Sequence, residues 1–490
     1  MKIPPKPPGL KEQLQDNVKL AALLVKSFEP EVQAAVRAIN DDYLHWDKVR
    51  FRETPLGLTA KELWFVTKTT RGAGKQPVPL SFSSKDKSLY YVSPPKHLEW
   101  IHHIDKQGGG TIGVTGHSTL GDESDRYLVN SLMEEAIASS QLEGASTTRK
   151  VAKEMLRAGR KPITDAEKMI MNNYRAILEV RDLKKESLTP KLLCHLQSVL
   201  TEDTLDNPDA VGRFRRGDEA IEVVDNVTGA VLHTPPPADE LEWRIKEICD
   251  FANSISNPFV HPVVKASILH FAIGYVHPFV DGNGRTARAL FYWYMLKRDY
   301  WLFEYFPISR VLVRSPGKYG RAYLYTETDG GDATYFIRYN IQAILIAMRE
   351  FYVYVAREEQ AAKEAASLLE SFPGLNQRQR FLIHDALKNP GMSCTFNSYE
   401  GKYHVTNPTA RADLLGLVQI GLLQQDKGSK THIFHPAVNL RELLHLPPSV
   451  VKAEKIKMPK PIAVTTRKPT ALPKTSTPKT TKSNQPPLFE

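Results

Sequence analysis

The stretch His277-Pro-Phe-Val-Asp-Gly-Asn-Gly-Arg-Thr-Ala-Arg288 brings an imidazole, a carboxylate, two glycines around an asparagine and two arginines into twelve residues. Gly282 and Gly284 predict a turn whose backbone takes positive φ and comes close to an anion without obstruction by a Cβ atom. Apolar residues at helical spacing over 287–294 then predict a helix. A helix that starts directly after such a turn favours a phosphate ligand, because free N–H groups and the helix dipole attract anions.

The charged side chains of this stretch fit the same kind of ligand. Arg285 and Arg288 are three residues apart, so both can reach one side of the first helical turn. Asp281 offers a short carboxylate of the kind that Mg²⁺ prefers when phosphates supply its other ligands. A second helical pattern precedes His277, and Pro278 disfavours a helical conformation at that histidine. The residues therefore predict a helix–turn–helix unit that binds a magnesium polyphosphate; the alternative is a glycine turn with solvated arginines.

The stretch fits every fixed position of the Fic signature, H-x-F-x-[D/E]-G-N-G-R-x-x-R, so the chain resembles the Fic family over roughly residues 125–350. Most members of this family transfer AMP from ATP to a protein hydroxyl. The resemblance implies that His277 is the catalytic base, since an imidazole with a pKa near 6.5 can take a hydroxyl proton at neutral pH. It implies Mg²⁺ with Asp281 as the metal ligand. It further implies that ATP contacts Asp281, Gly282, Asn283, Gly284, Arg285 and Arg288.

A second motif, Ser139-Ser-Gln-Leu-Glu-Gly144, ends a helix that we expect over about 125–144. Glu143 lies in the last turn of that helix, where the dipole disfavours a carboxylate, so a cationic partner is expected and Arg288 is the candidate. The motif is similar to the family's inhibitory pattern, [S/T]-x-x-x-E-[G/N]. The alternative is a solvated surface glutamate. The similarity implies inhibitory roles for Glu143, Ser139 and Gly144.

Two short β-prone runs, at 220–224 and 230–234, are joined by Asp225-Asn-Val-Thr-Gly229 and predict a β-hairpin. In Fic proteins a flap in this position covers the nucleotide and pairs with an extended target segment. The resemblance in order implies that Val231, Leu232 and His233 contact ATP. It also implies a place near the adenine for Tyr319, for which a plain core position is the alternative.

Composition excludes several other classes. The sequence contains no apolar run long enough to cross a membrane, and its start lacks the apolar core of a secretory signal. The three cysteines form neither a disulfide framework nor a zinc pattern. We therefore expect a cytoplasmic protein with no membrane partner. The formal charge of +10 is concentrated after Pro447, so it says little about partners of the folded part.

The chain of 490 residues predicts several domains and a mainly α fold: a Fic helical bundle with a β-hairpin flap, a mixed N-terminal domain and a C-terminal winged helix-turn-helix. The tail is rich in Pro, Lys and Thr and should be disordered. The expected boundaries are 1–115 for the N-terminal accessory domain, 116–355 for the Fic domain, 356–372 for a linker helix, 373–440 for the winged helix and 441–490 for the basic tail.

The winged-helix prediction rests on a helix at 377–387, a β-prone stretch, a helix with Asn407 as its N-cap and a final hairpin. DNA is then a candidate partner, because Arg411 and Lys427 or Lys430 could contact phosphates or base edges. Protein contact or packing in a homodimer is the alternative use of this domain.

The sequence thus predicts a protein adenylyltransferase that is autoinhibited by Glu143. Its partner would be a protein with a Tyr, Thr or Ser hydroxyl, the chain itself included. One alternative is removal of AMP by the same site, with Glu143 orienting water. Another is a DNA-binding regulator whose Fic core only senses nucleotide, although such a sensor has no need for His277. A different nucleotide or a phosphocholine donor is the third.

Overall fold

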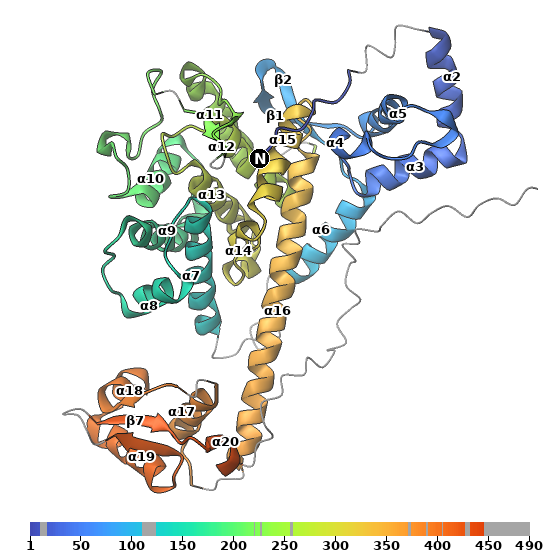
Figure 1. The fold of residues 1–490 in the computed structure, drawn as a ribbon. Helices are drawn as coiled ribbons and strands as arrows, with labels where there is room; N and C mark the ends of the chain where they lie inside the picture. Colours follow the sequence, from blue (N-terminus) through green and yellow to red (C-terminus); the bar gives the residue numbers. More distant parts are fainter. Residues whose placement is uncertain are drawn as a thin grey trace, which may run out of the picture. The chain divides into compact units, whose positions relative to one another are not determined.

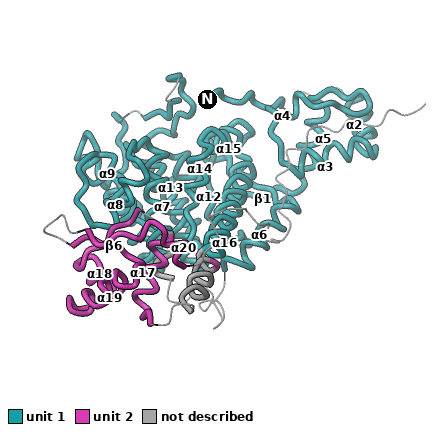
Figure 2. Tube along the Cα trace, turned by 60° about the horizontal axis from the view of Figure 1, so that its bottom comes forward, with its two compact units in different colours: residues 1–359 teal, residues 360–490 magenta. Residues whose placement is uncertain are grey.

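The computed structural model describes residues 1–9, 17–109, 124–219, 221–225, 228–254, 258–370, 374–388, 391–403, 405–426 and 432–444. The chain divides into two compact units, Met1–Glu359 and Gln360–Glu490 (Figure 2). The described residues are mainly α-helical (Figure 1), which confirms the predicted fold class. Most of the predicted tail lies outside the described residues. None of the described helices combines the length and apolarity needed to cross a bilayer.

The first part of unit 1 is mixed in structure, as the sequence predicts. β1 and β2 form an antiparallel hairpin. The elements are α2 (Asn17–Ser27), α3 (Pro30–Asp41), α4 (Trp46–Val49), η1 (Pro55–Gly57), α5 (Ala60–Gly72), β1 (Gln76–Phe82), β2 (Ser84–Tyr91) and α6 (Pro95–Gly108).

These elements divide between two apolar cores. Helices α2 to α5 pack around a cluster of their own that includes Val32, Val36 and Trp64. The buried side chains of β1, β2 and α6, from Val78 to Ile104, belong instead to the large core of the helical bundle. The assignment of residues 1–115 to one accessory domain stays a prediction, because β1, β2 and α6 share the core of the helical bundle.

The helical bundle forms the rest of unit 1. Its elements are α7 (Ser124–Leu142), α8 (Arg149–Ala158), α9 (Asp165–Asp182), η4 (Leu183–Lys185), α10 (Pro190–Thr201), η5 (Pro208–Ala210), β3 (Val223–Val224), β4 (Val231–His233), η6 (Ala238–Glu240), α11 (Leu241–Asn253), α12 (Pro262–Val276), α13 (Asn283–Lys297), η7 (Trp301–Glu304), α14 (Ser309–Val313), α15 (Pro316–Thr328) and α16 (Thr334–Glu370). The last residues of α16, from Gln360 on, belong to unit 2. The expected linker over 356–372 falls partly on this end of α16, and its role as a linker stays a prediction.

Helices α12 and α13 lie side by side in the core of this bundle. Nearly every residue of α12 is buried, which fits a sequence that is apolar all round the helix. Pro262 occupies the first turn of α12, where a missing N–H costs nothing. Helices α9 and α10 pack against α13, and α7 packs against α9. The turn between α12 and α13 is thus fixed on a rigid, fully packed helix pair.

Unit 2 has its own apolar core, built around residues such as Leu382, Leu414 and Phe434. Its three strands form an antiparallel sheet in the order β5-β7-β6. The β-prone stretch of the sequence contains a short strand followed by a helix. The elements are α17 (Gln377–Lys388), β5 (Cys394–Thr395), α18 (Phe396–Tyr403), α19 (Asn407–Gln419), β6 (Leu423–Asp426), β7 (Ile433–Pro436) and α20 (Leu440–Leu443).

The predicted N-cap of α19 is wrong by one residue. Thr406 is the N-cap, and Asn407 is the first helical residue. The Asn407 side chain accepts a hydrogen bond from Arg411 and donates one to Glu400, so it binds side chains instead of the helix N–H groups. Lys427 and Lys430 lie outside the described residues, and the winged-helix assignment stays a prediction.

Candidate functional site

The turn between α12 and α13 is held by the side chain of Asn283. Its Oδ1 accepts a hydrogen bond from the Phe279 N–H at 2.9 Å, and its Nδ2 donates one to the Phe279 carbonyl at 2.8 Å. Asn283 is buried, and the Phe279 ring packs against Phe214 beneath the turn. The resemblance implies that Asn283 contacts ATP. The amide is instead committed to the turn, which leaves only its backbone N–H for a ligand.

The two glycines of the turn serve different purposes. Gly282 takes φ +83°, as predicted, and precedes the first residue of α13. Gly284 does not take positive φ, so that part of the prediction is wrong: it is an ordinary helical residue. A Cβ atom at Gly284 would overlap with Oε1 of Glu143, well inside van der Waals contact. Gly284 is therefore needed to leave room for the Glu143 carboxylate.

His277 caps the C-terminus of α12 in a left-handed conformation, with φ 49°. Its Nδ1 lies 3.1 Å from the Gly274 carbonyl oxygen, which can only accept. Nδ1 therefore carries the hydrogen, and Nε2 keeps a lone pair for an incoming proton. Burial lowers the pKa of His277 below 6.5, and the nearby charge of Glu143 partly opposes this effect. The neutral, proton-accepting form is thus favoured at neutral pH.

The Arg215 side chain holds the backbone of His277 in place, and this role of Arg215 was not predicted from the sequence. Its Nε donates to the His277 carbonyl at 2.8 Å, and its Nη2 donates to the carbonyls of Pro236 and Val276. Its backbone N–H also donates to the Pro278 carbonyl. Carbonyls at a helix C-terminus lack partners within the helix, so a buried guanidinium can satisfy them. The sequence carries no signal for this contact beyond an arginine shortly before the hairpin.

The two arginines of the motif bind different elements. Arg285 donates to the Leu200 carbonyl at the end of α10 and to Oδ2 of Asp281, at 2.8 and 2.9 Å. Its guanidinium is fully buried, whereas half of the Asp281 side chain is exposed. We expected Arg285 and Arg288 to reach the same side of the helix. The structure corrects this, because Arg285 faces α10 and Arg288 faces α7.

Arg288 holds the end of α7. Its Nη2 donates to Oε1 of Glu143 at 2.9 Å and to the Ser139 carbonyl at 3.0 Å, and its Nε donates to Oγ of Ser139 at 2.9 Å. Arg288 is buried, while about a quarter of the Glu143 side chain is exposed. Gly144 follows with φ +96° and ends the helical path. The structure thus brings together the two motifs that the sequence separates by more than a hundred residues.

The predicted hairpin exists as β3 and β4, in antiparallel register. His233 anchors it, because its ring nitrogens lie 2.8 Å from Oε2 of Glu327 and 2.7 Å from the Tyr275 carbonyl oxygen. Val231 is exposed and Leu232 is half-buried. The hairpin is thereby tied to α15 and to the end of α12, next to His277. Contacts of these three residues with ATP stay a prediction.

Tyr319 lies in an aromatic cluster of α12, α15 and α16. Its hydroxyl oxygen lies 2.7 Å from Nε2 of His270, and burial keeps His270 neutral by lowering its pKa to about 3. Burial raises the pKa of Tyr319, and the positive charge of Arg288 opposes that rise. The ring therefore adjoins the Arg288 end of the site while it is packed as a core residue. Its predicted contact with adenine stays a prediction.

Comparisons with known proteins identify the same region. Residues 187–295 match the model of the Fic/DOC family, a range that contains His277 to Arg288 but neither Glu143 nor Tyr319. The "Protein adenylyltransferase Fic" of Nematostella vectensis is 31% identical over 107 residues, which are 22% of this chain and 23% of the relative. The "Protein adenylyltransferase fic-1" of Caenorhabditis elegans is 37% identical over 67 residues, 14% of this chain and 13% of the relative. The similarity thus spans less than a quarter of each relative.

Solved structures are similar at low sequence identity. A Fic family protein from Desulfovibrio desulfuricans G20 is 19% identical with a TM-score of 0.47, over 74% of this chain and 98% of that one. Residues 134–508 of Fic-1 from C. elegans are 16% identical with a TM-score of 0.44, over 71% and 96%.

Proposed function

The chain is a Fic domain protein, and we propose that it is a protein adenylyltransferase that moves AMP from ATP to a hydroxyl side chain of a protein. One observation carries the proposal: the ring of His277 keeps Nε2 as a proton acceptor at the beginning of the turn that leads into α13, whose start attracts anions. A unit that only senses nucleotide needs the helix start but has no use for the base.

The chemistry follows from this geometry. The hydroxyl oxygen of the target attacks the α-phosphorus of ATP, and its proton passes to Nε2 of His277. The bond between the α-phosphorus and its bridging oxygen breaks, and pyrophosphate leaves. Arg215 holds the backbone of His277, and the Gly274 carbonyl holds its ring, so the base is positioned before any substrate arrives.

The start of α13 would hold the phosphates. The first N–H groups of a helix have no partner inside the helix, and they point at whatever lies before the helix start. Arg288 is the cation expected to meet the terminal phosphate. Arg285 donates hydrogen bonds to the Leu200 carbonyl and to Asp281, and these contacts stabilise the turn between α12 and α13.

Asp281 is the residue that would hold Mg²⁺. The described residues contain no cluster of three or more His, Cys, Asp or Glu side chains suited to a metal. A half-exposed single carboxylate fits Mg²⁺, which commonly binds through one or two carboxylates together with substrate phosphates. Bound Mg²⁺ would neutralise charge on the phosphates of ATP.

Glu143 would restrain this activity. The Glu143 carboxylate accepts a hydrogen bond from the Arg288 guanidinium, which would otherwise meet the terminal phosphate. Gly284, which has no side chain, leaves room for this carboxylate beside the start of α13. A carboxylate and a phosphate are both anions, so they cannot share the donor that Arg288 gives to Glu143. We therefore infer that ATP binds unproductively until Glu143 leaves Arg288.

Two other functions have weaker support. Removal of AMP is favoured by one observation: Glu143, held by Arg288, would add a carboxylate base beside the imidazole of His277. DNA binding would rest on unit 2. There the Arg411 guanidinium lies over the Phe396 ring and donates to Asn407, so it is held against its own unit.

Labelled ATP tests the proposed function. Purified protein incubated with Mg²⁺ and ATP labelled at the α-phosphate should become labelled, or should label a target protein. ATP labelled at the γ-phosphate should leave no label, because the pyrophosphate departs. Label from the γ-phosphate would indicate phosphoryl transfer instead, and absence of label from both, also in a Glu143→Gly variant, would contradict the proposal.

The pH dependence of transfer provides a second expectation. The rate should rise with pH through a midpoint below 6.5, because the neutral form of His277 accepts the proton and burial lowers its pKa. Glu143 opposes this lowering, so the midpoint should move to still lower pH in the Glu143→Gly variant. The measurement is kcat/KM against pH for both proteins. A midpoint above 6.5, or a shift to higher pH in the variant, would contradict the assignment of His277.

A further inference from the structure

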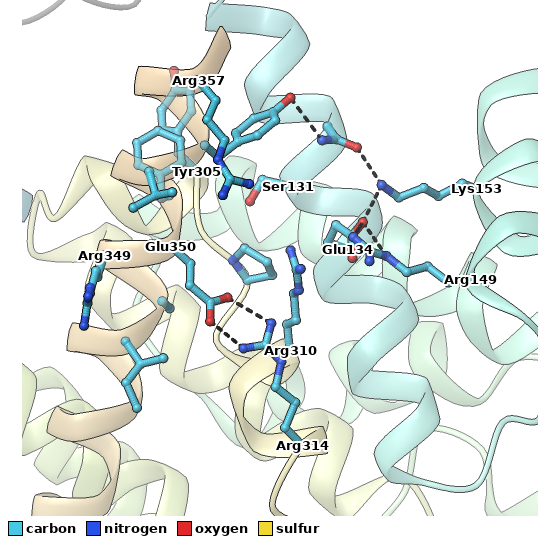
Figure 3. A pocket seen from close by; sticks show the side chains of 17 residues that line it. Ser131, Glu134, Arg149, Lys153, Tyr305, Arg310, Arg314, Arg349, Glu350 and Arg357 are labelled. Atoms are coloured by element: carbon cyan, nitrogen blue, oxygen red, sulfur yellow. Dashed lines mark hydrogen bonds and ion pairs between the residues drawn. The ribbon is translucent and has the colours of Figure 1, made fainter. Parts of the chain in front are cut away.

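A cavity of about 700 Å³ lies between α7, α8, α14 and α16, with lining residues from all four helices (Figure 3). Pockets for small-molecule ligands commonly have volumes of roughly 300–1,000 Å³. None of the residues that line it belongs to the site around His277. All of them lie within unit 1, so the cavity does not depend on the placement of unit 2.

Positive charge dominates the wall of this cavity. Six cationic side chains line it against two carboxylates, an excess of four positive charges. The carboxylates are Glu134 and Glu350. The cationic residues are Arg149, Lys153, Arg310, Arg314, Arg349 and Arg357.

The two carboxylates are already engaged. Glu134 accepts from Arg149 and pairs with Lys153. Burial would raise the pKa of Glu134, but the hydrogen bonds from these two cations outweigh it and hold that pKa below the usual value. The two carboxylate oxygens of Glu350 accept hydrogen bonds from Nη1 and Nη2 of Arg314. Neither acid is available to neutralise a further cation.

Arg310, Arg349 and Arg357 consequently line the cavity without an acidic partner among the described residues. Arg357 comes from α16, across the cavity from Glu134 on α7, and Arg310 comes from α14 (Figure 3). Cations gathered around a concave surface repel one another and raise the local concentration of anions. A guanidinium presents a planar set of donors that matches a phosphate in two-point contact. The wall is thus arranged for a ligand with more than one negative charge.

Part of the remaining wall is aromatic. Tyr305, Phe351 and Tyr354 line the cavity beside the arginines, and the rings of Tyr305 and Phe351 lie 6.0 Å apart. Tyr354 accepts a hydrogen bond from Asn130 on α7, which helps fix its ring. Aromatic faces next to guanidinium groups suit a ligand that has a planar group as well as phosphates.

We propose that this cavity binds a small molecule bearing two or more phosphate groups, with the phosphates against Arg310, Arg357 and the Arg149 side of the wall. The source of the phosphates is either a nucleotide, whose ring would rest on the aromatic wall, or an inorganic polyphosphate. This site is separate from the proposed ATP site, and its existence does not depend on the proposed transfer of AMP.

Calorimetric titration of the full chain tests the proposal. The background carries Arg288→Ala to weaken binding at the candidate active site. Sodium pyrophosphate and ADP are titrated separately at constant ionic strength without Mg²⁺. We expect saturable binding of one ligand per chain, and a Kd at least about tenfold weaker after Arg310→Gln with Arg357→Gln, which remove two charge-assisted contacts. ADP binding tighter than pyrophosphate assigns the site to nucleotides; equal or weaker binding of ADP assigns it to inorganic polyphosphate.

A matched control separates the pocket from general charge. Arg37→Gln with Arg52→Gln removes the same charge from two exposed arginines outside the cavity. It should leave both Kd values unchanged. Failure of both ligands to bind, equal affinity before and after the pocket substitutions, or an equal loss in the control would each overturn the proposal. A change in far-UV circular dichroism or in melting temperature without ligand would reveal a folding defect, in which case Arg357→Gln alone, at an exposed position, replaces the double variant.

Discussion

The His277→Ala variant is expected to lose transfer of AMP by a factor of about 10²–10⁴, the usual effect of removing a general base, while its affinity for ATP stays near that of the unchanged chain. The two effects differ because proton transfer and phosphate binding are assigned to different parts of the motif. The ring of His277 would handle a proton, and it is held by the Gly274 carbonyl of α12 and not by the helix start that would hold phosphates. Label incorporation and nucleotide affinity should be measured on the same preparation.

Two controls make this result specific. His277 has a left-handed backbone, which asparagine tolerates better than alanine, so His277→Asn should be equally inactive if the lost base is the cause. His102→Ala removes an exposed histidine of α6 and should change nothing. Transfer at the original rate in His277→Ala would remove this histidine from the mechanism. Recovery of transfer in His277→Asn alone would attribute the loss to backbone strain.

The Glu143→Gly variant is expected to transfer AMP faster than the unchanged chain. Removal of the carboxylate frees the Arg288 guanidinium for the terminal phosphate of ATP. A gain of about 1.4 kcal/mol towards the productive arrangement corresponds to about a tenfold higher rate. Initial rates of labelling at saturating ATP would show this increase.

A second substitution tests the route by which Glu143 acts. Glu143→Gly combined with Arg288→Ala should lose the gain, because the freed cation is missing. A folded Glu143→Gly protein whose transfer is equal to or below the original would contradict autoinhibition. If this variant instead fails specifically to remove AMP from a labelled target, Glu143 orients water in the reverse reaction.

The sequence predicted those parts of the site that depend on local chemistry. The spacing of the signature predicted two helices joined by a turn, and the structure has α12 and α13 with Gly282 at positive φ. Charge reasoning at the end of α7 also suggested Arg288 as the partner of Glu143, and the two side chains are in contact. In each case a short pattern determines the outcome, because helix ends and glycine turns impose strict local requirements.

The sequence did not predict features that arise only from tertiary packing. Arg215 lies about sixty residues before His277, and only the folded chain brings its guanidinium to the His277 carbonyl. The need for glycine at position 284 is visible only once the Glu143 carboxylate is placed beside it. Likewise, no pattern in β1, β2 and α6 indicates that they complete the core of the helical bundle.

The hydrogen bonds between Asn283 and Phe279 have a consequence for the thermodynamics of ligand association. These hydrogen bonds order the turn when the protein folds. The backbone entropy of the turn is therefore lost during folding, before any ligand binds. A nucleotide therefore meets a turn that needs no ordering, and the entropic penalty of association is correspondingly small. Under the proposed autoinhibition, any slow phase in nucleotide binding would then report the departure of Glu143 from Arg288.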